Sequence, residues 1–106
     1  LRTIGLKLPD ENLNSFHVYH LFTVYHPKRN SIINKLKKIK IETRVIYPYP
    51  IHKMKAYNKI IYNQKNLKNS EIKSKGIFCL PLYPELKNQD VKNICKNLKK
   101  IIEKEL

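Results

Sequence analysis

Runs of apolar residues along this 106-residue chain predict three strands. The strongest run is residues 16–25, where aromatic and β-branched side chains occupy both faces and Pro27 ends the pattern. Residues 41–47 and 77–80 are shorter runs, and each is closed by a proline that cannot donate a hydrogen bond to a sheet. We therefore expect residues 16–25 to be a central strand and the other two runs to pair with it.

Apolar residues at helical spacing predict three helices between and after these strands. The first helix carries an apolar stripe with lysines around the other side, and the stripe consists of Ile32, Ile33, Leu36 and Ile39. A short helix is predicted over residues 67–75, with Gly76 as a left-handed cap. The clearest stripe belongs to the C-terminal helix and consists of Val91, Ile94, Cys95, Leu98, Ile101 and Ile102.

Strands interleaved with helices predict an α/β fold, a two-layer sandwich in which helices pack on a sheet of about three strands. The first two strands and the helix between them would form a β-α-β unit. Residues 58–66 are polar and are predicted to be a loop. The length fits one domain, residues 1–106.

The net charge of +14 raises the question of a nucleic-acid partner. Of the 22 basic residues 19 are Lys, whereas base and phosphate recognition relies on the arginine fork. The charge is also evenly spread, +7 in residues 1–53 and +7 in residues 54–106, and is accompanied by an excess of Asn and Ile that an AT-rich genome explains. A lysine-coated surface is the favoured interpretation, and a small basic nucleic-acid-binding module is the alternative.

Apolar runs and cysteines indicate the compartment. Neither a run of about 20 apolar residues nor the apolar core of a signal peptide is present, so we expect a cytoplasmic protein with no membrane partner. Cys79 and Cys95 lie in apolar patterns without metal-binding spacing and are expected to be reduced. The first residue is Leu1 and not Met, which suggests an excised domain or a processed product.

Motifs for independent catalysis are missing from the sequence. His17 and His20 would point to opposite faces of a strand, so no metal site is predicted. Gly5 and Gly76 are the only glycines, and neither belongs to a phosphate-binding loop. A nucleophile elbow and a close carboxylate pair are also lacking, so we predict no catalytic residue in this chain.

The segment Tyr47–His52, YPYPIH, places polar aromatic groups and an imidazole on a proline-stiffened backbone at a predicted strand end. Strand ends of α/β sheets are common ligand sites. A connection whose tyrosines cover the core is the competing interpretation, and spacing alone favours it. A proline-rich peptide ligand for a recognition domain is a third, weaker interpretation.

Several segments in fixed order resemble the C-terminal domain of the DegT/DnrJ/StrS family of pyridoxal-phosphate-dependent sugar aminotransferases. The resemblance spans nearly the whole chain and rests on these segments: Leu6–Pro9 (LKLP), His17–Phe22 (HVYHLF), Lys28–Arg29, Ile41–Arg44 (IETR), Tyr47–His52 (YPYPIH), Ala56–Tyr57 and Leu80–Leu86 (LPLYPEL). Two positions depart from the family pattern. Lys40 stands where the family usually has Gly, and Ile46 stands where many members have His.

The resemblance implies the small domain of a fold-type-I aminotransferase that acts as a homodimer. Such an enzyme transfers an amino group from an amino acid, usually glutamate, to a nucleotide-linked keto-sugar. Its Schiff-base lysine and its other pyridoxal phosphate contacts belong to the large domain, which is absent from these 106 residues. The resemblance therefore implies that the isolated chain binds no cofactor and is not catalytic alone.

Three residues carry over as candidate substrate contacts. Tyr47 and His52 match the Tyr-Pro-x-Pro-x-His motif, which in the family lies near the sugar-nucleotide site. Arg44 on the preceding predicted strand could meet a phosphate or a carboxylate. The particular sugar, the nucleotide and the carbon that is aminated do not follow from the sequence.

Overall fold

The computed structural model describes residues 1, 4–57, 59 and 67–106, so most of the predicted loop at 58–66 lies outside the described residues. In chain order its elements are β1 (Phe22–Tyr25), α1 (Arg29–Lys38), the 3-10 helices η2 (Ile51–Lys53) and η3 (Lys55–Tyr57), α2 (Lys68–Gly76), β2 (Ile77–Leu80) and α3 (Asn88–Glu103). The three predicted helices are present, and the fold is a small α/β unit.

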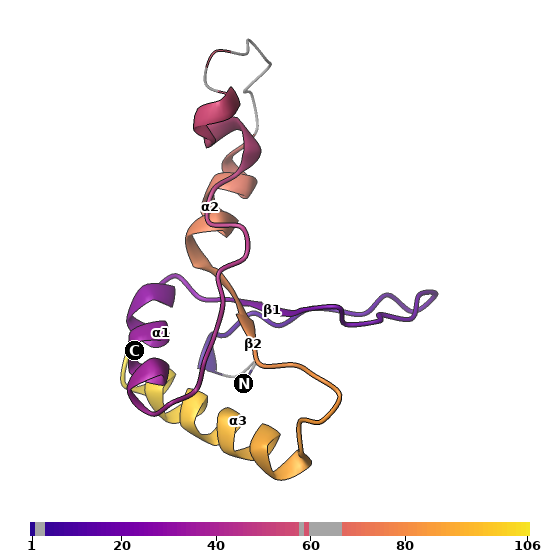
Figure 1. The fold of residues 1–106 in the computed structure, drawn as a ribbon, viewed down its shortest axis with the longest axis vertical. Coiled ribbons are helices and arrows are strands. Elements are labelled where there is room, and N and C mark those ends of the chain that lie inside the picture. The colour runs from indigo at the N-terminus through magenta and orange to yellow at the C-terminus, as the bar shows by residue number, and fades with distance from the viewer. Residues whose placement is uncertain (2–3, 58, 60–66) are drawn as a thin grey trace.

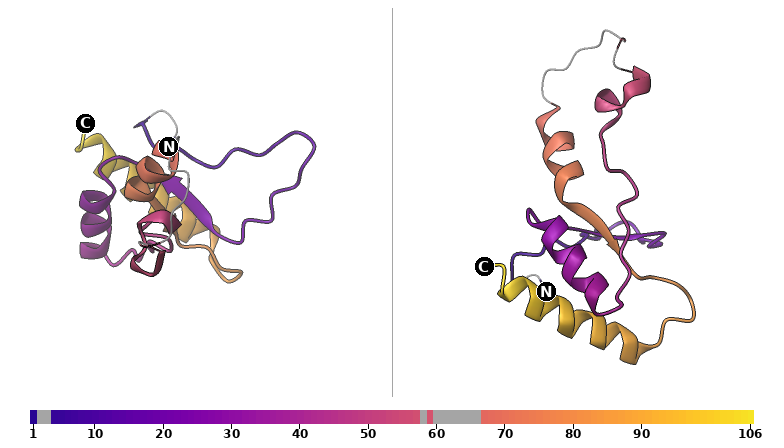
Figure 2. Two further views of the ribbon diagram at one scale, coloured as in Figure 1. Left: turned by 90° about the horizontal axis from the view of Figure 1, so that it is seen from above. Right: turned by 60° about the vertical axis from the view of Figure 1, so that its left-hand side comes forward.

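The core lies between one face of the sheet and the two helices α1 and α3, which lie side by side (Figures 1 and 2). β1 and β2 are antiparallel, and Val24 is opposite Phe78 with both side chains 1% exposed. Four helix residues close over this pair and are completely buried: Ile32, Leu36, Leu98 and Ile102. The helical stripes predicted from the sequence therefore supply the core, as expected for an amphipathic helix packed on a sheet.

The prediction of three strands is wrong, because residues 41–47 pair with β2 at one position only. Arg44 and Cys79 exchange two backbone hydrogen bonds, Arg44 N–H to Cys79 O at 3.2 Å and Cys79 N–H to Arg44 O at 2.7 Å. At the next position where β2 could pair, the Ile77 carbonyl instead accepts Nη1–H of Arg29 at 3.2 Å. The pairing between these residues and β2 therefore ends after one bridge. β2 lies between β1 and Arg44, whereas the sequence predicted residues 16–25 and 41–47 to be adjacent parallel strands.

The long central strand predicted at residues 16–25 is also too long. In the observed register Phe22 pairs with Leu80, the last residue of β2, so β2 offers no partner beyond Phe22. Residues 16–21 therefore leave the sheet, and His17 and His20 are not strand residues. The argument that placed these histidines on opposite faces of a strand does not apply.

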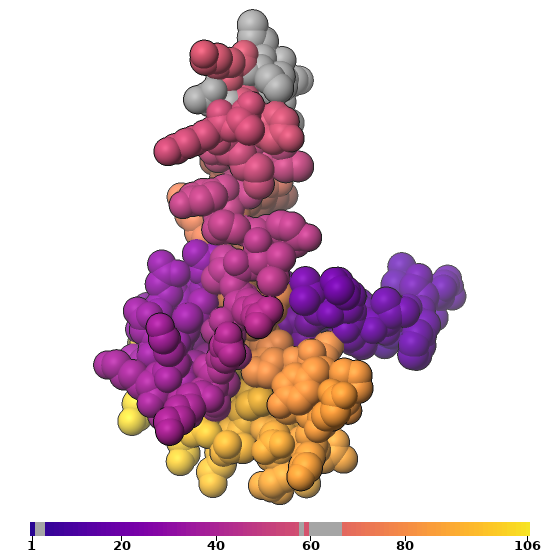
Figure 3. Space-filling model, viewed as in Figure 1, coloured from indigo at the N-terminus to yellow at the C-terminus, as the bar shows by residue number. Residues whose placement is uncertain are grey.

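Two segments project from the core (Figure 3). The arm, residues 8–21, carries the exposed side chains of Leu13, Phe16 and Val18. The α2 projection consists of η2, η3 and α2. The Cα radius of gyration is 15.8 Å, against about 13 Å for a compact domain of this length. Both projections are thus poorly covered by the chain itself.

The arm has internal order. The His17 ring stacks on the Tyr19 ring at 4.1 Å, and Tyr19 stacks on Phe22 at 5.6 Å. Tyr19 N–H donates to His17 Nδ1 at 2.8 Å, and His17 N–H donates to Glu11 Oε1 at 2.8 Å. Tyr19 has a φ of +48°, a conformation that L-residues adopt at some cost. The arm therefore holds a defined shape although its apolar side chains face solvent.

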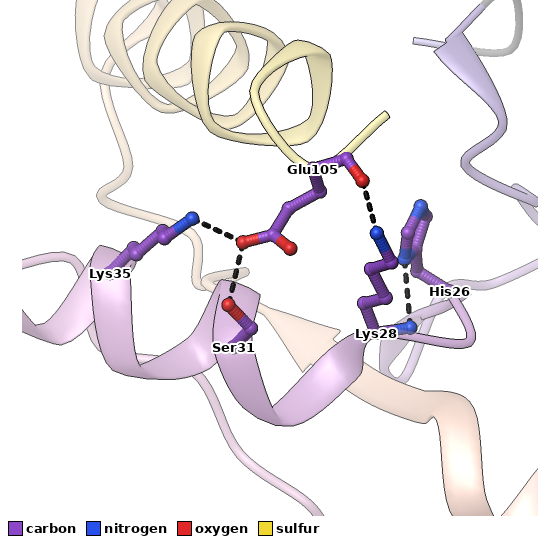
Figure 4. Close-up of polar contacts among 5 residues, drawn as sticks. All are labelled: His26, Lys28, Ser31, Lys35 and Glu105. Carbon is purple, nitrogen blue, oxygen red and sulfur yellow. Dashed lines mark hydrogen bonds and ion pairs between the residues drawn. The ribbon is translucent and has the colours of Figure 1, made fainter.

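A polar cluster ties the end of the chain to the start of α1 (Figure 4). Glu105 Oε1 accepts from Ser31 Oγ at 2.6 Å and from Lys35 Nζ, while its carbonyl accepts from Lys28 Nζ. The hydrogen bond from Lys35, followed by that from Ser31, lowers the pKa of Glu105. Beside them His26 is buried, its Nδ1 accepts from Lys28 N–H at 3.0 Å, and burial lowers its pKa.

Helix α1 ends in a Schellman motif at Lys40. Lys40 N–H donates to Lys37 O at 3.0 Å, and Ile41 N–H donates to Leu36 O at 3.0 Å. Leu36 and Ile41 are both buried, which supplies the hydrophobic contact typical of this motif. Lys40 has a φ of +61°, the left-handed region in which glycine carries no Cβ penalty. The position where the family pattern has Gly is thus the helix cap.

Lys40→Gly is expected to stabilise the chain by about 0.5–1 kcal/mol, since relief of the left-handed strain exceeds the extra backbone entropy of glycine. The measurement is the free energy of unfolding in denaturant. The matched control is Lys37→Gly, the same replacement inside α1, which should destabilise by about 0.5–1 kcal/mol. Equal effects of the two changes would contradict the cap.

Among the described residues, no helix has the length and apolar character needed to cross a membrane.

Candidate functional site

The segment Tyr47–His52 forms one wall of a groove with a volume of about 550 Å³. Pro48 and Pro50 fix the backbone, and η2 begins directly after Pro50 and turns the chain toward α2. The groove is lined by Tyr47, Pro50, Ile51, His52, Tyr57, Leu67, Ser70, Lys73, Ser74 and Ile77. The structure therefore brings Tyr47 and His52 to one surface at the base of the α2 projection.

His52 is the most enclosed polar side chain contributed by the Tyr47–His52 segment, with 8% of its side chain exposed. Its Nε2 lies 2.8 Å from Oε1 of Glu71, which extends from the first turn of α2. Lys53 Nζ lies 3.5 Å from the same carboxylate oxygen. The hydrogen bond with His52 is the main cause of the lowered pKa of Glu71, and the charge of Lys53 also lowers it.

Tyr47 lies on the rim of the groove with 64% of its surface exposed. Tyr49 is equally exposed at 64%, but it does not line the groove. Of the two tyrosines in this proline-stiffened segment, Tyr47 alone therefore borders the groove. This pair offers a natural comparison between a groove tyrosine and a surface tyrosine.

Arg44 is not brought to this groove. Its side chain is 74% exposed, lies 4.0 Å from Oε1 of Glu42, and lines a separate hollow of about 630 Å³ between the Arg44 segment and the start of α3. The backbone pairing of Arg44 with Cys79 holds it at the edge of the sheet. Of the three predicted substrate contacts, the structure places Tyr47 and His52 together and Arg44 apart.

Glu71, the hydrogen-bond partner of the groove residue His52, is a residue that sequence reasoning missed. It lies 19 residues from His52 on a different element, so no local motif connects the two. One signal was available, since Glu71 is the only acidic residue between Glu42 and Glu85 in a lysine-rich stretch. A single acidic residue in a lysine-rich stretch indicates that its carboxylate has a specific partner in the fold.

The groove combines apolar walls with an imidazole, two phenols, two serines and a lysine, a set that can hydrogen-bond a polar ligand while excluding water from part of it. Metal binding has no support in the part of the chain that is described, where no three His, Cys, Asp or Glu residues gather.

The described residues do not fit the role of cofactor lysine either. A lysine that condenses with a carbonyl needs a desolvated setting. Every described lysine is exposed except Lys35, which is partly buried and paired with Glu105. Lys73 at the groove instead lies over the Tyr25 ring, 4.7 Å from its centroid. The groove is therefore a candidate ligand-contact surface.

Comparison with known proteins gives a match to the family model of DegT/DnrJ/EryC1/StrS aminotransferases over residues 2–99. A pleiotropic regulatory protein of Geobacillus stearothermophilus is 31% identical over 90 residues, 85% of this chain and 24% of the relative. A dTDP-3-amino-3,4,6-trideoxy-alpha-D-glucose transaminase of Micromonospora megalomicea is 29% identical over 99 residues, 92% of this chain and 26% of the relative. The chain thus spans about a quarter of the length of these relatives.

Solved structures resemble the same part. DesV of S. venezuelae, in complex with a ketimine intermediate, superposes with a TM-score of 0.86 at 26% identity, covering 93% of this chain and 27% of that one. NtdA of Bacillus subtilis with bound cofactor PMP superposes with a TM-score of 0.79 at 25% identity, covering 96% and 24%. The fold described above is therefore one part of a larger structure in both proteins.

Proposed function

Because this chain belongs to the DegT/DnrJ/EryC1/StrS aminotransferase family, we propose that it is the C-terminal small domain of a pyridoxal-phosphate-dependent sugar aminotransferase. The complete enzyme transfers an amino group from an amino acid, with glutamate as the proposed donor, to a nucleotide-linked keto-sugar. The observation that carries this proposal is the match to the family model over residues 2–99. The similarity to a dTDP-amino-sugar transaminase supports the substrate class.

The remainder of the enzyme supplies the cofactor site in this proposal. The chain has about a quarter of the relatives' length and, among its described residues, no enclosed lysine. The cofactor, when bound, provides the electron sink for moving the amino group. The isolated chain then neither binds the cofactor nor transaminates, and residues 1–106 act as one domain of a homodimeric enzyme.

The two projections support docking to the remainder of the enzyme. Leu13, Phe16 and Val18 on the arm are 100%, 88% and 80% exposed. Tyr57 and Ile72 on the α2 projection are also exposed. Apolar groups on projections of defined shape are typical of surfaces covered in an assembly. In the complete enzyme the cofactor-binding domain covers them.

Within this proposal His52 and Tyr47 contact the sugar nucleotide. Their hydrogen-bonding groups line the groove between the Tyr47–His52 segment and α2, where a sugar hydroxyl can meet an imidazole or a phenol. Arg44 contacts a phosphate or a carboxylate from its separate hollow, where most of its guanidinium is exposed.

His52→Ala in the full-length enzyme is expected to raise the KM for the nucleotide sugar about tenfold, the loss of one good hydrogen bond. Tyr47→Phe should raise it by a smaller factor, and neither change should alter the half-reaction with the amino donor. The measurement is steady-state and single-turnover kinetics. Tyr49→Phe is the matched control, since it removes an equally exposed phenol outside the groove. Unchanged KM values for both His52→Ala and Tyr47→Phe would remove the groove from the substrate site.

A further inference from the structure

We propose that Glu71 is a positioning residue for His52. It fixes the orientation of the imidazole ring and keeps the proton on the Nε2 atom. The inference rests on the proposed function in one respect, since it takes the groove to be a substrate surface. Its structural content is independent of that and concerns two side chains brought together from η2 and α2.

The first argument is the direction of the hydrogen bond. An ionised carboxylate can only accept, and the lowered pKa of Glu71 keeps it ionised at neutral pH. At 2.8 Å from Glu71 Oε1, the Nε2 atom of His52 must therefore carry the proton. The Glu71 carboxylate thus selects which form of the imidazole faces the ligand.

The second argument is the difference in burial between the partners. Only 8% of the His52 side chain is exposed, whereas 39% of the Glu71 side chain is exposed. The carboxylate stays hydrated at the rim while the ring is enclosed by groove walls. A ring turned away from Glu71 would lose this hydrogen bond in an enclosed setting, so Glu71 favours the observed orientation of His52.

The third argument concerns the partners of Glu71. Lys53 is 3.5 Å from the same carboxylate oxygen and is 54% exposed. An exposed ion pair of this kind contributes little on its own. The closer contact, with the less exposed partner, is the one to His52, so the placement of Glu71 is explained by His52 and not by Lys53.

The direct test follows the Nε2 proton of His52 by NMR in ¹⁵N-histidine-labelled chain. We expect a visible Nε2–H signal whose exchange with water is slowed about tenfold or more, and loss of this protection in Glu71→Ala. Glu71→Gln keeps an acceptor oxygen without charge and should give partial protection. If the Glu71→Ala variant does not fold, the Glu71→Gln variant alone provides the test. The control is Glu103→Ala, which removes another helical carboxylate, one that pairs only loosely with Lys99 at 3.9 Å.

An unprotected Nε2 proton in the wild-type chain would overturn the positioning role. So would protection that survives both Glu71 replacements. These outcomes do not depend on catalysis, so they separate this inference from the proposed function.

The second test is a double-mutant cycle on the KM for the nucleotide sugar in the full-length enzyme. If Glu71 acts through His52, Glu71→Ala and His52→Ala each raise KM about tenfold and the double variant raises it no further. A double variant that multiplies the two effects to about a hundredfold would overturn the inference. If His52→Ala leaves KM unchanged, the substrate role of His52 fails, and the NMR result alone decides the role of Glu71.

Discussion

Phe78→Ala is expected to lower the free energy of unfolding by about 3–5 kcal/mol, the cost of removing a large side chain from a closed core. Phe78 is 1% exposed, lies opposite Val24 in the sheet, and packs in the same cluster as Leu36 and Leu98. A domain of this size has a total stability of about 5–15 kcal/mol. The substitution should therefore shift the denaturant midpoint substantially, as followed by circular dichroism.

Phe16→Ala is the matched control for this change. Phe16 is 88% exposed on the arm, so the same replacement should change the stability of the chain by less than about 0.5 kcal/mol. Similar losses for Phe16 and Phe78 would show that the arm is packed in solution and that the described core is incorrect.

Gly76→Ala is expected to destabilise the chain by about 1–3 kcal/mol, although alanine favours helices. A Cβ at this last residue of α2 would lie 2.4 Å from Cε2 of Tyr25 and 2.8 Å from the carbonyl oxygen of His26. The tyrosine ring can move, but the carbonyl belongs to backbone that is itself tied down, since His26 N–H donates to Gly76 O at 3.0 Å. Steric overlap therefore outweighs the helix propensity.

The comparison for Gly76→Ala is Lys75→Ala, at the exposed neighbouring helical position, which should be nearly neutral. The free energies of unfolding of both variants are measured from urea unfolding curves of the chain. A Gly76→Ala variant as stable as the parent would mean that Tyr25 and His26 do not approach α2 as described.

The prediction that Gly76 is a left-handed cap is wrong, and the reason is instructive. Gly76 has no positive φ and is glycine because β1 passes close to it. A sequence pattern cannot distinguish a glycine needed for backbone conformation from one needed for close approach. The residue that does adopt the left-handed cap conformation is Lys40, whose side chain gives no such signal.

Helix periodicity predicted the helical part of the core, because Ile32 and Leu36 in α1, and Leu98 and Ile102 in α3, are four residues apart and share one helix face. Strand lengths were not predictable, because they depend on the partner. β2 has four residues before Pro81, and this limits how far residues 16–25 and 41–47 can pair. Local composition made both neighbouring segments look like full strands.

For the candidate site, Tyr47 and His52 line one groove, since they are close in sequence and the prolines restrict the chain between them. Arg44 was grouped with them by proximity in sequence, but its pairing with Cys79 directs it to another hollow. The contact between Glu71 and His52 could not be predicted from sequence spacing, because it depends on how α2 packs against η2.

The late position of β2 in the chain bears on how the domain folds as it is synthesised. β1 and α1 leave the ribosome before β2 and α3, and the partner of β1 begins 52 residues after Tyr25, at Ile77. At about 5–20 residues per second this interval lasts roughly 3–10 s, during which Val24 and Leu36 have no sheet partner and no α3 to cover them. The first half of the domain therefore exposes apolar side chains until β2 and α3 have left the ribosome, and the tie between Glu105 and α1 forms only after residue 105 has done so.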